Sequence, residues 1–149
     1  MFKKYRLGFD FWGLLLFLII MIPNFIWFVA PAPNDILRAD SITPIIDGIG
    51  SIAQLAFVAS ICLLLRKEID KIKLSKLIIF TMAMIATYFV GWILYYCGMA
   101  NTIVIALLTI PPCMAFIIYA VDRKNVIAII PAVIFTICHV IYGFVNFVF

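Results

Sequence analysis

The side chains most capable of chemistry in this sequence are six polar residues placed within two long apolar segments. In each segment three of them follow one another at spacings of three and four residues, which brings them to one face of a helix. They are Asp47, Ser51 and Gln54 in the first segment, and His139, Tyr142 and Asn146 in the second. Their carboxylate, hydroxyl, amide and imidazole groups can hold a small molecule through hydrogen bonds, and Asp47 and His139 could exchange protons with it.

Other chemistries have weaker support in the sequence. A hydrolase triad could be drawn from Ser51, His139 and Asp47, but no nucleophile elbow or glycine-rich oxyanion loop surrounds the serine. The chain has a single histidine, and its four cysteines include no CxxC pair. We therefore expect no metal, no other cofactor and no disulfide framework.

The helices that carry these residues can be predicted from the composition of the chain. Of the 149 residues, 67% are hydrophobic and 12% are charged, and the mean hydropathy is +1.24. A soluble domain has about 25% charged residues, so a water-soluble fold is excluded. A helix needs roughly 20 apolar residues to cross a bilayer, and the charged residues, with a turn at Cys97–Asn101, divide the chain into segments of about that length. We predict an all-α integral membrane protein, a single domain over residues 1–149 with five transmembrane helices at about 11–30, 44–65, 75–97, 102–121 and 126–148.

The basic residues set the predicted orientation. Ten of the eleven Lys and Arg residues lie before the first span, between spans two and three, or between spans four and five, and only Arg38 lies on the other side. Because cytoplasmic loops are enriched in Lys and Arg, we predict the N-terminus inside and the C-terminus outside. The expected location is a cell membrane, with the bacterial cytoplasmic membrane favoured. The short basic connector Arg66–Lys76 is best explained by contact with anionic lipid headgroups, and nothing indicates a nucleic-acid partner.

This orientation brings the two polar sets to matching depths. Span two runs inward and span five runs outward, so the sets are antiparallel. At about 1.5 Å per residue, the members of each set lie roughly 5, 10 and 15 Å below the outer surface. The predicted pairs, from shallow to deep, are Asp47 with Asn146, Ser51 with Tyr142, and Gln54 with His139. With Asn24 of span one in the same outer layer, spans two and five would face each other across a polar slot open to the outside.

From this slot we expect a non-catalytic protein that binds or passes a small amphipathic molecule. Asp47 would hold a cationic or hydroxyl group of the molecule, and Gln54 and His139 would form the floor of the slot. A transport path would require a homo-oligomer or a partner membrane subunit. The small residues of span three (Ala83, Thr87 and Gly91) recur every four positions and form a strip suited to such a helix contact.

Two other functions fit the same residues. An accessory or immunity-type subunit would pack against a larger complex, and its slot would be filled by side chains. An intramembrane enzyme acting on a lipid would use Asp47 and His139 as acid and base. Each residue also has a purely structural explanation, since a helix dipole favours an acid such as Asp47 in the first turn, and His139 could be a neutral core residue bonded to a carbonyl group or to Gln54.

Overall fold

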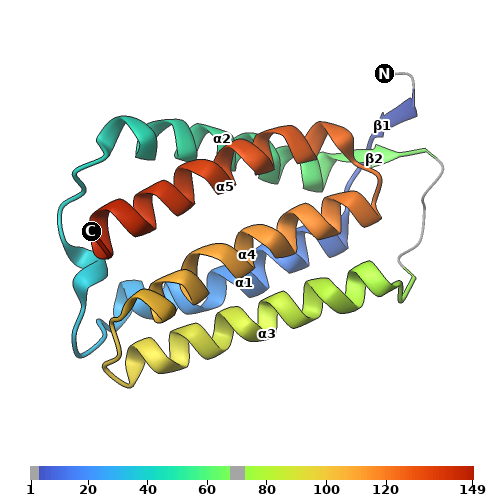
Figure 1. Cartoon of the computed structure of the whole chain (residues 1–149). Helices are drawn as coiled ribbons and strands as arrows, with labels where there is room; N and C mark the ends of the chain where they lie inside the picture. The colour runs from blue at the N-terminus through green and yellow to red at the C-terminus, as the bar shows by residue number, and fades with distance from the viewer. Residues whose placement is uncertain (1–3, 68–72) are drawn as a thin grey trace.

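The computed structural model describes residues 4–67 and 73–149, and these residues form five long helices (Figure 1). They are α1 (Phe11–Val29), α2 (Pro44–Leu63), α3 (Lys76–Tyr96), α4 (Thr102–Asp122) and α5 (Val126–Phe147). Each is long and apolar enough to cross a membrane. The prediction of an all-α, multi-pass membrane protein with five spans is therefore confirmed, and every helix end lies within two residues of its expected position. The orientation in the membrane stays a prediction.

Polar residues placed just before the helices fix where they begin. The Asp10 carboxylate accepts hydrogen bonds from two backbone N–H groups in the first turn of α1. The other side-chain caps are Ser75 for α3, Asn101 for α4 and Asn125 for α5. These bonds satisfy N–H groups that have no partner within the first turn, so the polar connectors define the helix starts within an otherwise apolar sequence.

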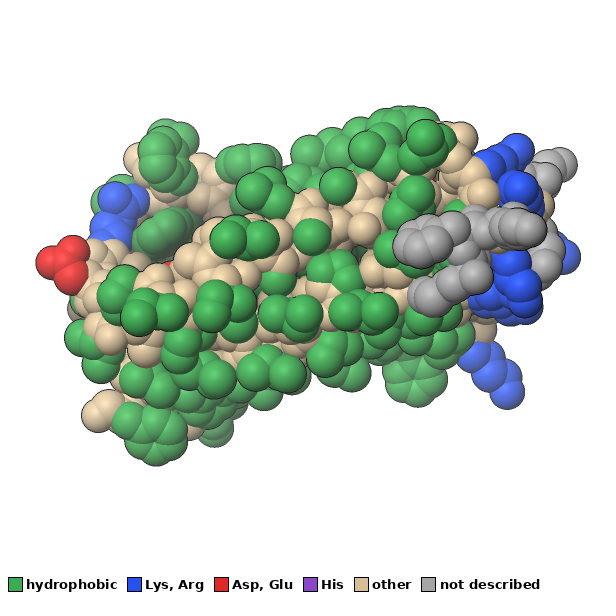
Figure 2. Space-filling view, turned by 90° about the horizontal axis from the view of Figure 1, so that it is seen from above, with side chains coloured by type: hydrophobic (Ala, Val, Ile, Leu, Met, Phe, Trp, Pro, Cys, Tyr) green, Lys and Arg blue, Asp and Glu red, His purple; other side chains and the backbone are tan. Residues whose placement is uncertain are grey.

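The helices alternate in direction, with α1, α3 and α5 running one way and α2 and α4 the other (Figure 1). α4 is the most deeply buried helix and packs between α3 and α5, while α2 pairs with α5. The core includes a group of packed aromatic rings, in which the Phe57 ring lies 4.8 Å from that of Phe116 and 5.3 Å from that of Phe135. Large apolar side chains also cover the outer surface (Figure 2), as expected where lipid is the solvent.

One end of the bundle collects the positive charge, as Figure 2 shows. We call it the basic end. It carries a short antiparallel pair of strands, β1 (Tyr5–Leu7) and β2 (Leu64–Arg66), in which Arg6 lies opposite Leu65. This pair ties the segment before α1 to the segment after α2. The opposite end, which we call the C-terminal end, carries residues 30–43 and the end of the chain (Figure 1).

A buried ion pair joins three helices at the basic end. The Asp10 carboxylate accepts a hydrogen bond from Arg123 Nε at 3.2 Å and another from the Tyr119 hydroxyl at 3.1 Å. Both charged side chains are less than one-tenth exposed. The Asp10 backbone N–H donates to the Cys62 carbonyl at 2.7 Å. Because these residues belong to the start of α1 and the ends of α2 and α4, their bonds fix the three helix ends together.

One member of the strip of small residues on α3, Gly91, packs against another helix of the same chain. Gly91 is buried against α4, and a Cβ atom at this position would come within 2.8 Å of the Leu107 Cβ. Thr87 donates its hydroxyl hydrogen to the Ala83 carbonyl of its own helix. Gly91 therefore already forms a close contact between α3 and α4, whereas Ala83 of the same strip is exposed. Whether the strip also contacts a second membrane protein stays a prediction.

Candidate functional site

A cavity of about 250 Å³ lies between α2 and α5, where the sequence predicts a slot. Asp47, Ser51 and Gln54 line it from α2, and His139 and Tyr142 line it from α5. We call this cavity the slot. The structure thus brings five of the seven candidate residues to one place, and the polar faces of the two helices are turned towards each other.

Asn146, at the C-terminal end of α5, ties that helix to the start of α2. Its side-chain amide donates to Thr43 Oγ1 at 2.8 Å, and its side-chain oxygen accepts from the Ile42 backbone N–H at 2.7 Å. The Thr43 hydroxyl donates in turn to the Asp47 carboxylate at 3.0 Å. The predicted pair of Asp47 and Asn146 is therefore connected through Thr43 rather than directly, and Asn146 has a structural role beside the slot.

The deeper part of the slot is organised by stacked rings. The His139 imidazole lies 5.1 Å from the Phe135 ring and 6.4 Å from the Tyr142 ring, each at an interplanar angle of 18°. The Ser51 hydroxyl donates to a backbone carbonyl of its own helix. Within the described chain, Gln54 and His139 form no side-chain hydrogen bond, to each other or to another residue. Their polar groups are left for whatever occupies the space beside them.

A second cavity, which we call the bundle cavity, adjoins the slot and has a volume of about 330 Å³. Gln54, His139 and Tyr142 line both spaces. All five helices contribute to its wall, and none of the described Asp, Glu, Lys or Arg residues lines it. The aromatic residues of the wall are Phe17, Trp27, Tyr88, Trp92, Phe116, Phe135, Tyr142 and Phe147. The described wall is therefore uncharged, mostly apolar and rich in aromatic rings.

Asn24, the seventh candidate residue, lines the bundle cavity rather than the slot. Its amide donates to the Tyr88 hydroxyl at 2.7 Å and to the Ile20 carbonyl at 3.2 Å. The Trp92 indole N–H is buried nearby and approaches the Tyr88 hydroxyl without the geometry of a hydrogen bond. This part of the wall therefore uses the Asn24 amide internally and retains one unused donor.

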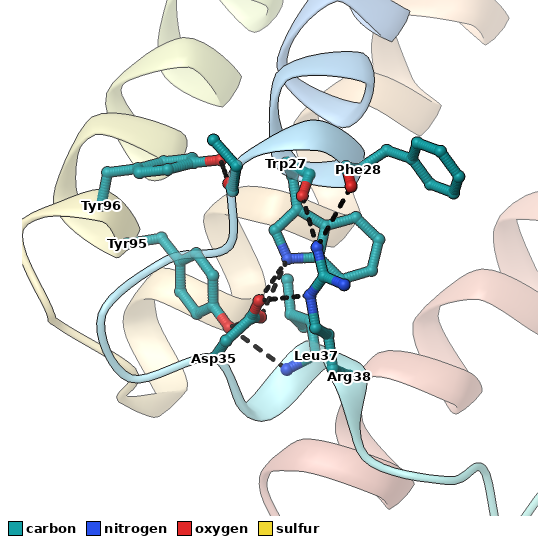
Figure 3. Close-up of polar contacts among 8 residues, drawn as sticks. Trp27, Phe28, Asp35, Leu37, Arg38, Tyr95 and Tyr96 are labelled. Carbon is teal, nitrogen blue, oxygen red and sulfur yellow. Dashed lines mark hydrogen bonds and ion pairs between the residues drawn. The ribbon is translucent and has the colours of Figure 1, made fainter.

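Residues 30–43 form a strap across the C-terminal end of the bundle, and Leu37 of the strap lines the bundle cavity. Asp35 holds the strap in place (Figure 3). Its carboxylate accepts hydrogen bonds from the Trp27 indole at 2.9 Å, from the Tyr95 hydroxyl at 2.8 Å and from Arg38 Nε at 2.8 Å. The Arg38 guanidinium also lies 4.9 Å from the centroid of the Trp27 ring.

The hydrogen bonds to Asp35 change its acidity. Partial burial raises the pKa of the Asp35 carboxyl, but the bonds from the indole, the phenol and the guanidinium outweigh this effect. The pKa of Asp35 therefore lies below its ordinary value of 3.8, and the strap is held by a carboxylate at neutral pH.

The sequence did not reveal this cluster as part of the site. Asp35 and Arg38 lie in a short polar connector, and Tyr95 is 60 residues away from Asp35. The one signal available was an acidic and a basic residue three positions apart, close after a tryptophan, on the side of the membrane that carries little charge.

No family model matches this chain, and neither a curated protein nor a solved structure matches it.

Proposed function

We propose that this protein binds a small, neutral, amphipathic molecule in the bundle cavity, with the polar group of the molecule held by Gln54 and His139. One observation carries the proposal. These two side chains line both the slot and the bundle cavity, and neither forms a side-chain hydrogen bond within the described residues. Both side chains are half-buried between the helices, and a polar group without a partner is unfavourable in such apolar surroundings. A polar group on a ligand would supply the missing bonds.

The wall of the bundle cavity supports a ligand with a neutral, apolar body. Small-molecule sites are typically apolar and aromatic, with a few placed polar groups. A charged ligand would lose its hydration here without meeting an opposite charge among the described lining residues. Asp47 lines the slot and not the bundle cavity, so we assign it to the entrance and not to the final position of the ligand.

The slot is the proposed entrance. Asp47 lies in the first turn of α2 at the C-terminal end, and Gln54 lies about 10 Å further along the same helix. A molecule entering beside Asp47 and Ser51 would reach Gln54 and His139, where the aromatic wall begins. If the orientation predicted from the basic residues is correct, this entrance faces the outside.

The test is tryptophan quenching by 4-bromophenol, a small phenol that is neutral at pH 7. In purified Trp12→Phe protein the two remaining tryptophans, Trp27 and Trp92, both line the bundle cavity. We expect saturable quenching, in contrast to the linear quenching produced by probe dissolved in detergent. Replacing Gln54→Leu together with His139→Phe keeps the size of both side chains but removes their polar groups, and should weaken binding about tenfold through the loss of two neutral hydrogen bonds.

The matched control is Ser60→Ala. Ser60 also lies on α2, but its hydroxyl donates to the Ala56 carbonyl and it lines neither cavity. Its replacement should leave the quenching curve unchanged. Quenching that never saturates, or equal affinity in the double variant and its parent, would refute a ligand site at Gln54 and His139.

A further inference from the structure

A groove of about 350 Å³ lies between α1 and α3 and shares no residue with the slot or the bundle cavity. Leu15 and Ile19 line it from α1, and Ile78 and Met82 line it from α3. It extends about 10 Å along α1. Both helices start at the basic end (Figure 1), so the groove runs from that end towards the middle of the bundle.

The polar groups in the wall of this groove are already bonded within the protein. The Thr81 hydroxyl donates to the Leu77 carbonyl at 3.0 Å. The Tyr119 hydroxyl donates to the Asp10 carboxylate. The rest of the wall is hydrocarbon apart from Trp12 and Lys73, which lie near the helix starts. The interior of the groove therefore suits a hydrocarbon chain, which needs no hydrogen bond.

The mouth of the groove carries positive charge. Lys73 lines it just before α3 begins. By sequence, the segments at this end carry ten Lys and Arg residues and four Asp and Glu residues. Of these acids, Asp10 is paired with Arg123, and Asp122 accepts the hydroxyl hydrogen of Ser75. An apolar groove with the Lys73 ammonium group at its mouth matches a molecule with an anionic head and a hydrocarbon tail.

We propose that the groove between α1 and α3 binds an anionic phospholipid, with one acyl chain along Leu15, Ile19 and Met82 and its phosphate beside Lys73. Trp12, which is 47% exposed at the same end of the groove, occupies the headgroup level that tryptophan prefers in membrane proteins. A basic residue near an anionic lipid surface strengthens attraction to that surface.

The test measures lipid retention by native mass spectrometry on the full chain purified in neutral detergent. Phosphatidylglycerol and phosphatidylcholine with identical acyl chains are added in equal amounts. We expect the protein to retain phosphatidylglycerol preferentially. Lys73→Gln should reduce this preference about fivefold, through the loss of one basic residue at the lipid surface. Leu15→Trp, which fills the groove, should reduce retention of both lipids.

Two matched controls separate the groove from the general surface. Lys124→Gln removes an exposed charge at the same end, and Ile79→Trp enlarges an exposed residue of α3; neither residue lines the groove. Both variants should behave as the parent. Equal retention of the two lipids by the parent protein would overturn the proposal, and so would an equal loss of preference in Lys73→Gln and Lys124→Gln. Lys73 is exposed, so its replacement decides the outcome even if Leu15→Trp unfolds.

Discussion

At the scale of single residues, two carboxylates connect parts of the chain that are distant in sequence. Asp10 accepts a hydrogen bond from Tyr119, 109 residues later, and Asp35 accepts one from Tyr95, 60 residues later. Each is bonded to several donors, one of them an arginine. Hydrogen bonds to charged groups contribute about 1.5–3 kcal/mol each, roughly twice the value of neutral ones. Replacements here are therefore expected to have larger effects than at other polar positions.

Asp35 makes the stability of the fold depend on pH. Its pKa in the folded chain lies below the ordinary value of 3.8, so its contribution is complete above that value and is lost as the pH falls through the lower, folded pKa. Asp35→Asn should lower stability by about 1–2 kcal/mol at pH 7. The difference in unfolding temperature between parent and variant should be constant from pH 7 to about pH 5 and should shrink as the pH falls below 3.8. Asp40→Asn, in the same strap, should have no effect. A difference between parent and Asp35→Asn that does not shrink below pH 3.8 contradicts the assignment.

The pair formed by Asp10 and Arg123 is sensitive to the loss of one partner. Arg123→Met leaves a carboxylate buried without its cation, which costs about 3–5 kcal/mol in other proteins. Adding Asp10→Asn should restore part of this loss, because asparagine keeps the helix cap without the unpaired charge. Chemical unfolding in detergent measures both effects. Lys124→Met, at the adjacent exposed position, is the control, and a double variant less stable than Arg123→Met would show that the charge pair is not the cause.

At the scale of elements, the sequence predicted the helices well and the short strands not at all. Apolar length decides whether a segment spans a membrane, so the charged residues and the turn at Cys97–Asn101 together marked the five helices. β1 and β2 have three residues each, which is too short for an alternating pattern, and they pair only because α1 and α2 bring them together. The spacings of three and four residues also predicted which faces of α2 and α5 are polar, and these faces line one cavity. Gly91 packs against α4. The spacing of small residues along α3 does not indicate which helix lies opposite them, so this contact could not be predicted.

The close packing of α3 on α4 predicts a destabilising effect of Gly91→Ala. The added methyl group would lie 2.8 Å from the Leu107 Cβ and 3.2 Å from the Leu107 carbonyl carbon. The helices would have to separate, at a cost of about 1–3 kcal/mol. Gly48→Ala is the matched control, because a Cβ there meets nothing within 4 Å and alanine favours the helix. Thermal unfolding should show a clear loss for the first variant and none for the second. Equal behaviour would mean that α3 and α4 are not in close contact.

At the scale of the whole molecule, the candidate site shows where inference from sequence stops. The slot could be predicted because its polar residues recur on single helix faces. The bundle cavity could not, because its wall comes from all five helices and its volume is what their side chains leave unfilled. The strap could not either, since the partners of Asp35 come from α1, α3 and the strap itself. Helix faces are local properties of a sequence, whereas cavities and long-range hydrogen bonds depend on how the helices pack.

The orientation of the molecule can be tested with its own cysteines. Cys97 is exposed at the C-terminal end, whereas Cys62, Cys113 and Cys138 are buried or half-buried. Because ten of the eleven basic residues belong to the other end, we predict that Cys97 faces the outside. A bulky, membrane-impermeant maleimide should then label intact cells, and Cys97→Ser should abolish the labelling. In the Cys97→Ser background, Lys76→Cys at the basic end should react only after the membrane is permeabilised. Labelling of Lys76→Cys in intact cells would show that the orientation is opposite to the predicted one. The entrance beside Asp47 would then open to the cytoplasm.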